Sequence, residues 1–417
     1  MRLKLTYILL FFTLPMCLTA QERKTSRLTH RHTDSVDNVM VDTTMMVNGV
    51  PQKDLYDEVK KLFHKKPHPG KSDSITSKPV FTGVPAVGYT LQSRFALTLS
   101  GNAAFRLSPM AKVSTITASA AYTQNKQFTM PIESNIWTKH NHWDFIGDIR
   151  FYKYPQSTFG LGSQSYIGNE DPMDYTFFRF YETVLRQVTG NLYAGAGYII
   201  DEHWNISDIG TKNGGPNDYR QYGAQSHTVS SGFTLNALMD SRDNSINPSK
   251  GFYTALQYRT SYGFLGSTRN WNSLIVDVRK YYHFPVSSRN VIAFWNYDWL
   301  VLSGKPPYLD LPSTSWDAYS STGRGYIQGR FRGAQMVYLE TEYRFGITAN
   351  GLLGGVVFLN GQSFSAAPGS HLQAMQPGFG PGLRLKLNKI SKTNISVDYG
   401  FGREDSKGVF INIGELF

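Results

Sequence analysis

From about Val80 onward, apolar and polar residues alternate one by one in long segments. A period of two is the period of a β-strand, whose successive side chains point to opposite faces. The segments 251–264 and 394–401 each place aromatic and aliphatic residues on one face and polar or charged residues on the other. The same holds for MVYLETEYRF, where Val337, Leu339, Tyr343 and Phe345 alternate with Tyr338, Glu340, Glu342 and Arg344. The pattern predicts an all-β chain.

The alternation also assigns an apolar and a polar face to residues 291–301, although this segment contains few charged residues. In VIAFWNYDWLV, residues 291–301, the rule places Trp295, Tyr297 and Trp299 on the apolar face, with Asn296 and Asp298 on the polar face. In a membrane barrel the apolar face meets lipid and the charged face lines the lumen. We therefore expect this tryptophan-rich face to point outward.

A soluble sandwich would bury the apolar faces between two sheets, whereas a barrel in a membrane would expose them to lipid. Three features favour the barrel: the strands are long, the chain begins like an exported protein, and GVFINIGELF at its end is a strand with a terminal aromatic residue. Glu415 fits imperfectly on the face of that strand, which is formed by Val409, Ile411, Ile413 and Phe417. A bilayer tolerates no unpaired strand edge, so we expect closure.

The alternating segments number fifteen between residues 93 and 417, and the short segment GVPAVGYT, residues 83–90, supplies a sixteenth. A barrel with both ends on one side of the membrane needs an even number of strands. We predict a 16-stranded antiparallel transmembrane β-barrel over residues 80–417, with fourteen strands as the fallback. The long segments would then be extracellular and the short turns periplasmic; these are 155–172, 203–225 and 303–333, and 108–111, 139–141 and 189–191.

Residues 1–20 have the features of a signal peptide. Arg2 and Lys4 precede the apolar run at 5–14, and CLTA offers a cleavage site after Ala20. Met16 is too large for the position before a lipidated cysteine, which argues against lipidation of Cys17. Cys17 is the only cysteine, so cleavage after Ala20 would leave neither disulfides nor thiol chemistry.

Residues 21–79 are polar and poor in aromatic residues, and we expect a mostly disordered periplasmic tail. Within it, residues 54–66 have helical spacing and place Leu55, Val59, Leu62 and Phe63 on one face. This segment is either a short docking or interfacial helix or a transient one.

The net charge of +11 raises the question of an acidic partner. An exported protein rarely meets nucleic acid, so outer-membrane lipid and lipopolysaccharide are better candidates than nucleic acid. A scattered, solvated surface is the plainer alternative. No nucleophile, metal or phosphate-loop signature is present, and KHNH at 139–142 falls in a predicted turn. We therefore expect no enzyme, no cofactor and no metal.

The segment 239–253 contains the most specific turn of the chain. Asp and Asn side chains can hydrogen-bond their own backbone, and Pro and Gly fix the direction of a turn. The residues concerned are Asp240, Arg242, Asp243, Asn244, Pro248 and Gly251. They predict a well-ordered periplasmic turn.

This turn and a later R-G-Y motif at 324–326 resemble, in their order and spacing, the BamA/TamA-type outer-membrane assembly superfamily. The resemblance covers about residues 80–417 and includes E-Y-R at 342–344, G-x-G-x-R at 380–384 and D-Y-G at 398–400. It implies a barrel in the outer membrane of a Gram-negative bacterium that helps to insert proteins into that membrane or translocate them across it.

In that family the long loop folds back into the lumen and its arginine resembles a latch on the barrel wall. The resemblance implies that Arg324 is the latch, with Gly325 and Tyr326 beside it. A buried guanidinium requires fixed carboxylate partners. Glu342, Glu340 and Asp398 are the expected partners, and Asn360 stands where the family usually has an aspartate. We expect this replacement either to weaken the latch or to leave a glutamate as its partner.

Residues 21–79 are too short and too polar for the periplasmic transport modules typical of the family. The chain thus resembles a barrel-only member, and we expect it to work with periplasmic or outer-membrane partner proteins. The alternative is a pore or a structural subunit of an outer-membrane complex, without a role in assembly.

Overall fold

The computed structural model describes residues 46–47, 50–62 and 79–417, apart from positions 91, 216, 319 and 390. The expected signal peptide and most of the expected tail lie outside these residues. The helical pattern at 54–66 corresponds to α1 (Leu55–Leu62), and positions 63–66 lie outside the described residues. Two-residue strands, β1 (Met46–Val47) and β2 (Val50–Pro51), pair just before α1. Lys389 joins α1 to the barrel, because its Nζ lies 2.8 Å from Asp57.

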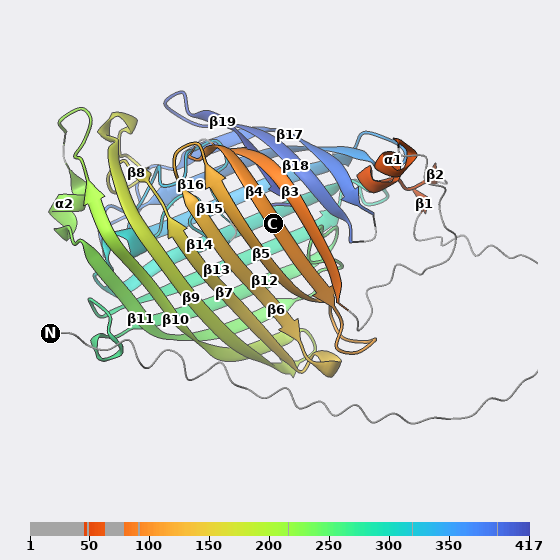
Figure 1. Cartoon of the computed structure of the whole chain (residues 1–417), viewed down its shortest axis with the longest axis horizontal. Helices are drawn as coiled ribbons and strands as arrows, with labels where there is room; N and C mark the ends of the chain where they lie inside the picture. Colours follow the sequence, from red (N-terminus) through yellow and green to blue (C-terminus); the bar gives the residue numbers. More distant parts are fainter. Residues whose placement is uncertain are drawn as a thin grey trace, which may run out of the picture. The chain divides into compact units, whose positions relative to one another are not determined.

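Sixteen antiparallel strands form one closed barrel, as predicted, and the fallback of fourteen is not needed (Figure 1). Neighbours in sequence are neighbours in the sheet, and the last strand closes on the first. The strands are β3 (Val80–Thr90), β4 (Arg94–Phe105), β5 (Ser114–Thr123), β6 (Phe128–Trp137), β7 (Trp143–Lys153), β9 (Asp171–Thr189), β10 (Leu192–Asp208), β11 (His227–Asp240), β12 (Gly251–Ser261), β13 (Trp271–His283), β14 (Val291–Gly304), β15 (Gln335–Gly346), β16 (Leu353–Phe364), β17 (Gln376–Asn388), β18 (Thr393–Phe401) and β19 (Lys407–Ile413).

The three longest connections, 154–170, 209–226 and 305–334, leave one end of the barrel, called here the long-loop end (Figure 1). The opposite end, called the short-turn end, has connections of at most ten residues, and a few short turns also lie at the long-loop end. The connections at the long-loop end hold the remaining elements: β8 (Gln156–Thr158), which pairs with β9, η3 (Ile167–Asn169), α2 (Asp218–Gly223), η4 (Gly263–Leu265) and η5 (Tyr308–Asp310). η2 (Lys139–Asn141) lies in a short turn. The predicted first strand, 83–90, was too short, since β3 begins at Val80.

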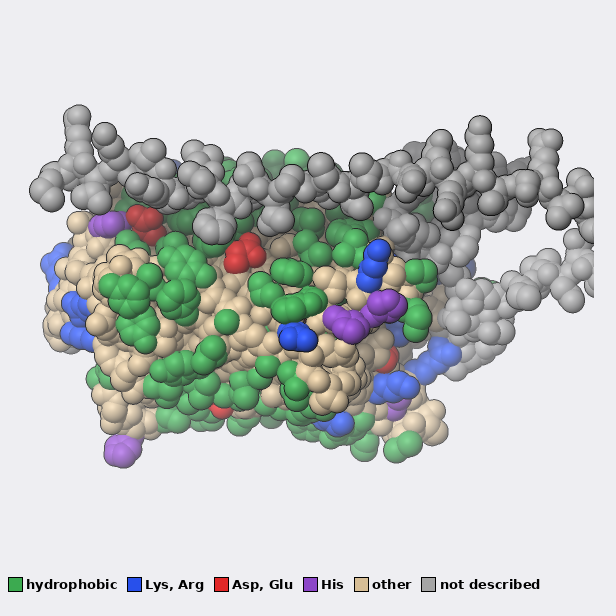
Figure 2. Space-filling model, turned by 90° about the horizontal axis from the view of Figure 1, so that it is seen from below, with side chains coloured by type: hydrophobic (Ala, Val, Ile, Leu, Met, Phe, Trp, Pro, Cys, Tyr) green, Lys and Arg blue, Asp and Glu red, His purple; other side chains and the backbone are tan. Residues whose placement is uncertain are grey.

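The two faces of the strands differ as the alternation predicts. Leu256, Leu339 and Val397 point outward and are exposed, whereas Glu342 and Asp398 point inward and are buried. Figure 2 shows hydrophobic side chains spread over one flank of the molecule, with few charged side chains among them. Within the described part of the chain, no helix is both long and apolar enough to cross a membrane.

The prediction for 291–301 was wrong. Trp295 and Tyr297 face the lumen and are 2% and 6% exposed, while Asn296 and Asp298 lie on the outer face. The reason is the pairing with β15, in which Trp295 stands opposite Glu340, because directly paired residues share a face. Both faces of β14 carry apolar residues, so its own alternation does not decide the orientation.

The last strand also differs from the prediction. β19 ends at Ile413, and residues 414–417 leave the wall instead of continuing the strand. Phe417 does not face outward but is 3% exposed inside the barrel. Its ring is stacked on Trp295 with 5.1 Å between ring centroids. Glu415 is an imperfect fit to an outward face because it belongs to the interior.

Candidate functional site

Residues 305–334 connect β14 to β15 and fold into the lumen, where most of them are buried. The loop is held together partly by Arg332, whose Nη1 donates to the carbonyl oxygens of Tyr308 and Leu309 at 3.1 and 3.2 Å. It is fixed to the wall as well, since Arg150 of β7 donates to the Ala318 carbonyl at 2.6 Å. The predicted long loop is therefore an internal element that fills the barrel.

Arg324 reaches three carboxylates on the lumen face of the wall. Its Nη1 donates to Asp398 at 2.6 Å, and its Nη2 donates to both Glu340 and Glu342. The guanidinium lies over the ring of Phe358 at 3.7 Å from the ring centroid. Arg324 is 1% exposed, so these interactions act at low dielectric, where each is stronger than in water.

Two wall arginines complete this group. Arg344 lies 2.7 Å from Glu342, and Arg384 lies 2.5 Å from Asp398. We call Arg324, Glu340, Glu342, Arg344, Arg384 and Asp398 the Arg324 cluster. Three of its members, Glu340, Glu342 and Arg344, alternate along β15, and this alternation is the signal that could have placed Arg344 in the set from the sequence alone. The interaction of Arg384 with Asp398 joins neighbouring strands and was missed.

The backbone of the loop touches the wall where the wall has no side chains. Gly325 has φ of +104°, a conformation that favours glycine, and a β-carbon there would lie 2.5 Å from the Phe401 carbonyl oxygen. A β-carbon on Gly378 of β17 would lie 2.5 Å from the Arg324 carbonyl oxygen. The side chain of Arg324 reaches its partners because the two backbones approach this closely.

Tyr326 fixes the other side of the motif. Its hydroxyl donates to the Pro377 carbonyl at 2.6 Å and accepts from the Arg403 backbone at 3.0 Å. Its ring packs on Phe331 with 5.2 Å between centroids. The tyrosine thus ties the loop to β17 and to the turn after β18.

Asn360 binds a different part of Arg324 from the one expected. Its Nδ2 donates to the main-chain oxygen of Arg324 at 3.0 Å, so it binds the backbone of the loop and not the guanidinium. An aspartate could not donate this hydrogen bond when ionised. The guanidinium has three carboxylate partners without Asn360, and the amide adds a hydrogen bond between the loop and the wall.

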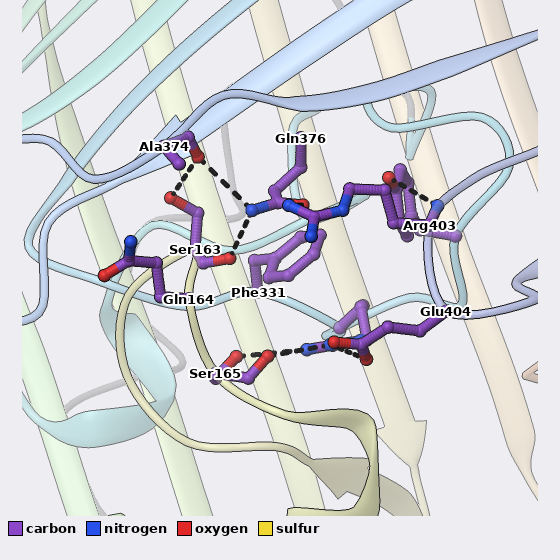
Figure 3. Close-up of a pocket in the computed structure, with 10 residues that line it drawn as sticks. Ser163, Gln164, Ser165, Phe331, Ala374, Gln376, Arg403 and Glu404 are labelled. Atoms are coloured by element: carbon purple, nitrogen blue, oxygen red, sulfur yellow. Dashed lines mark hydrogen bonds and ion pairs between the residues drawn. The ribbon is translucent and has the colours of Figure 1, made fainter.

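Arg330, which had no predicted role, lines a cavity of about 220 Å³ at the long-loop end. Figure 3 shows Phe331, Arg403 and Glu404 around this cavity. Arg330 lies 2.8 Å from Glu404, and its Nη1 donates to the Ser165 hydroxyl at 3.0 Å. Arg403 lines the same cavity and donates to Gln376 at 3.2 Å. The lining can therefore hydrogen-bond a small polar group, beside the aromatic rings of Tyr326 and Phe331.

A second group of charges lies on the wall formed by β6, β7, β9, β10 and β12, and its arginines and Asp201 are buried while Glu133 is partly exposed. Its ion pairs run Glu133–Arg150, Arg150–Asp148, Asp148–Arg179, Arg179–Asp201 and Asp201–Arg259, with N–O distances of 2.7–3.5 Å. We call these residues the far-wall cluster. All six come from strands.

The turn between β11 and β12 is organised by its own side chains. Arg242 donates to both oxygens of Asp240 at 2.9 and 2.8 Å. Asp243 accepts from the backbone of Ser249 at 2.8 Å, and Asn244 accepts from the next residues of the turn. Gly251 has φ of +110°, and Pro248 lies in the bend before it. These residues make one turn at the short-turn end, away from Arg324.

The fold is similar to that of two solved outer-membrane proteins. The structure of BamA from Haemophilus ducreyi lacking POTRA domains 1–3 matches with a TM-score of 0.51 and 12% identity, over 80% of this chain and 69% of that chain. CdiB from Acinetobacter baumannii matches with a TM-score of 0.52 and 11% identity, over 80% of this chain and 59% of that chain. No protein-family model and no curated protein sequence matches the chain. At these identities the likeness concerns the fold.

Proposed function

We propose that the protein is an outer-membrane barrel that helps to insert proteins into the outer membrane of a Gram-negative bacterium, or to translocate them across it. The observation that carries the proposal is the docking of Arg324, from a loop inside the lumen, on Glu340, Glu342 and Asp398. This arrangement is the one implied by the R-G-Y resemblance, and the barrel fold of BamA and CdiB supports it. In this proposal the long-loop end is extracellular and α1 is periplasmic.

The working element in the proposal is the seam between β3 and β19. β19 is the shortest barrel strand, with seven residues, whereas β3 has eleven. A short pairing is easier to open, and an opened edge presents unpaired backbone groups that can template a client strand. Partner proteins that bring clients to the short-turn end, and contacts with outer-membrane lipid and lipopolysaccharide, belong to the proposal.

A disulfide across the seam tests this function. Cysteine pairs scanned along β3 and β19 should abolish assembly of other outer-membrane proteins, and reduction should restore it. Leu256→Cys with Val276→Cys is the matched control, because these residues face each other on β12 and β13 away from the seam. Activity that is insensitive to every seam disulfide would refute an opening seam.

An open pore is the alternative, and the contents of the lumen argue against it. The loop packs with the inner wall into buried clusters that include Phe331, Tyr326 and Trp295. We expect only small conductance from the protein in planar bilayers. A large, stable conductance, together with normal outer-membrane protein levels after depletion, would favour the pore.

A further inference from the structure

Residues 414–417 turn from the end of β19 into the lumen. Gly414 has φ of +108° and begins the turn. The side chain of Glu415 is 2% exposed, and Phe417 is 3% exposed. A charged and an aromatic side chain from the same short segment are thus buried against the inner wall, next to the seam strand.

Two wall arginines hold this segment. Arg384 donates from Nε to Glu415 at 2.7 Å, and Asn394 donates to the other carboxylate oxygen at 2.5 Å. Arg344 donates to the main-chain oxygen of Phe417 at 2.9 Å. Hydrogen bonds between charged groups in a buried site are among the stronger ones in proteins.

The same two arginines belong to the Arg324 cluster. Arg384 binds Asp398 as well as Glu415, and Arg344 binds Glu342 as well as Phe417. Asp398 and Glu342 are partners of Arg324. The loop and residues 414–417 are therefore linked through two carboxylates, because Glu342 and Asp398 bind Arg324 and also bind the two arginines that hold residues 414–417.

We propose that Glu415 and Phe417 are positioning residues that fix the end of β19 to the inner wall. We also propose that the strength of this attachment depends on whether Arg324 is docked. If Arg324 withdraws, Asp398 and Glu342 lose a cation and attract Arg384 and Arg344 more strongly. Both arginines then bind residues 414–417 less firmly, so release of the loop loosens β19. The biological role of this coupling rests on the proposed function, whereas the contacts themselves do not depend on it.

Hydrogen exchange of the full-length protein in lipid nanodiscs, read by mass spectrometry, tests the coupling. Glu415→Gln, which keeps the shape of the side chain, should speed exchange in residues 407–413 by about tenfold, because a charge-assisted pair is lost. Glu415→Asp should restore part of the protection. Arg324→Met should speed exchange both in the loop and in residues 407–413.

Glu133→Gln is the control, because it makes the same chemical change in the far-wall cluster, where Glu133 pairs with Arg150 but is more exposed than Glu415. It should leave residues 407–413 unchanged. Unaltered exchange of β19 in Glu415→Gln or in Arg324→Met would overturn the coupling, as would an equal rise in Glu133→Gln. Exchange needs no client, so failure here is distinct from failure of the seam disulfide, which would overturn the proposed function instead.

Discussion

The Arg324 cluster and the far-wall cluster solve the same physical problem in different ways. Each buries several charges inside the barrel, and buried charges must be paired. The far-wall cluster has three arginines and three carboxylates, all on strands. The wall members of the Arg324 cluster are three carboxylates but only two arginines, and the third arginine comes from the loop.

The difference indicates which side of the barrel depends on the loop. Without the loop, the far-wall cluster would still be neutral, whereas the other wall would keep an uncompensated negative charge. The excess lies on β15 and β18, and β18 is paired with the seam strand β19. Docking of the loop therefore neutralises charge on one side of the barrel selectively, and this is the side on which the proposed function depends.

The largest effects should come from removing one arginine from each cluster, Arg324 from the first and Arg259 from the second. Arg324→Met should destabilise the docked loop by about 3–5 kcal/mol, since three buried carboxylates lose a partner. Limited proteolysis should then cut residues 305–334. Arg259→Met should lower the unfolding temperature while leaving the loop resistant. Equal protease sensitivity of the two variants would remove the distinction between the clusters.

A smaller effect is expected from filling the space between loop and wall. Gly378→Val should weaken docking by about 1–3 kcal/mol, because the new side chain would overlap the Arg324 main chain. Gly88→Val is the control, since a side chain there would meet nothing within 4 Å. Protease resistance of the loop in both variants would show that close backbone contact is not required.

Asn360→Asp tests whether the amide is a donor or a weak substitute for a charge. The ionised aspartate cannot donate to the Arg324 carbonyl oxygen, so the loop should become about 1–3 kcal/mol less firmly docked. Protection from protease is again the measurement. Tighter docking in the variant would mean that the cluster lacks a counter-charge at this position, as the sequence alone suggested.

The smallest effect concerns the short-turn end, which neither cluster touches. Partial burial acts to raise the pKa of Asp243, but hydrogen bonds from Ser249 and Lys250 outweigh it and lower the pKa below the ordinary 3.8. A lowered pKa gives stability that is present above 3.8 and is lost as the pH falls through the folded value. Asp243→Asn should therefore flatten the acid dependence of hydrogen exchange in residues 241–250, without changing the loop.

Much of the fold could be predicted from the sequence because alternation reports the two environments of a strand. It worked for β15 and β18, where one face is charged and the other is not. It failed for β14, because both faces of that strand contain large apolar residues and pairing with β15 decides between them. It also failed after Ile413, where Glu415 was the one residue that departed from the pattern.

The candidate site was predictable in part for a related reason. Glu340, Glu342 and Asp398 alternate with outward residues, so their inward direction followed from the pattern. The hydrogen bond from Asn360 to the Arg324 backbone did not follow from the pattern, because it depends on the path of a loop and not on the residue types. The sharing of Arg344 and Arg384 with residues 414–417 also requires three dimensions.

The glycine at position 378 has a consequence for any attempt to exchange parts of this barrel. Where β17 carries no side chain, the inner surface is completed by a segment that lies far away in sequence, the backbone around Arg324. β17 and residues 305–334 thus form one structural unit. A chimaera that receives β17 without this loop would have a gap in its lining, and one that receives the loop without β17 would have no room for it.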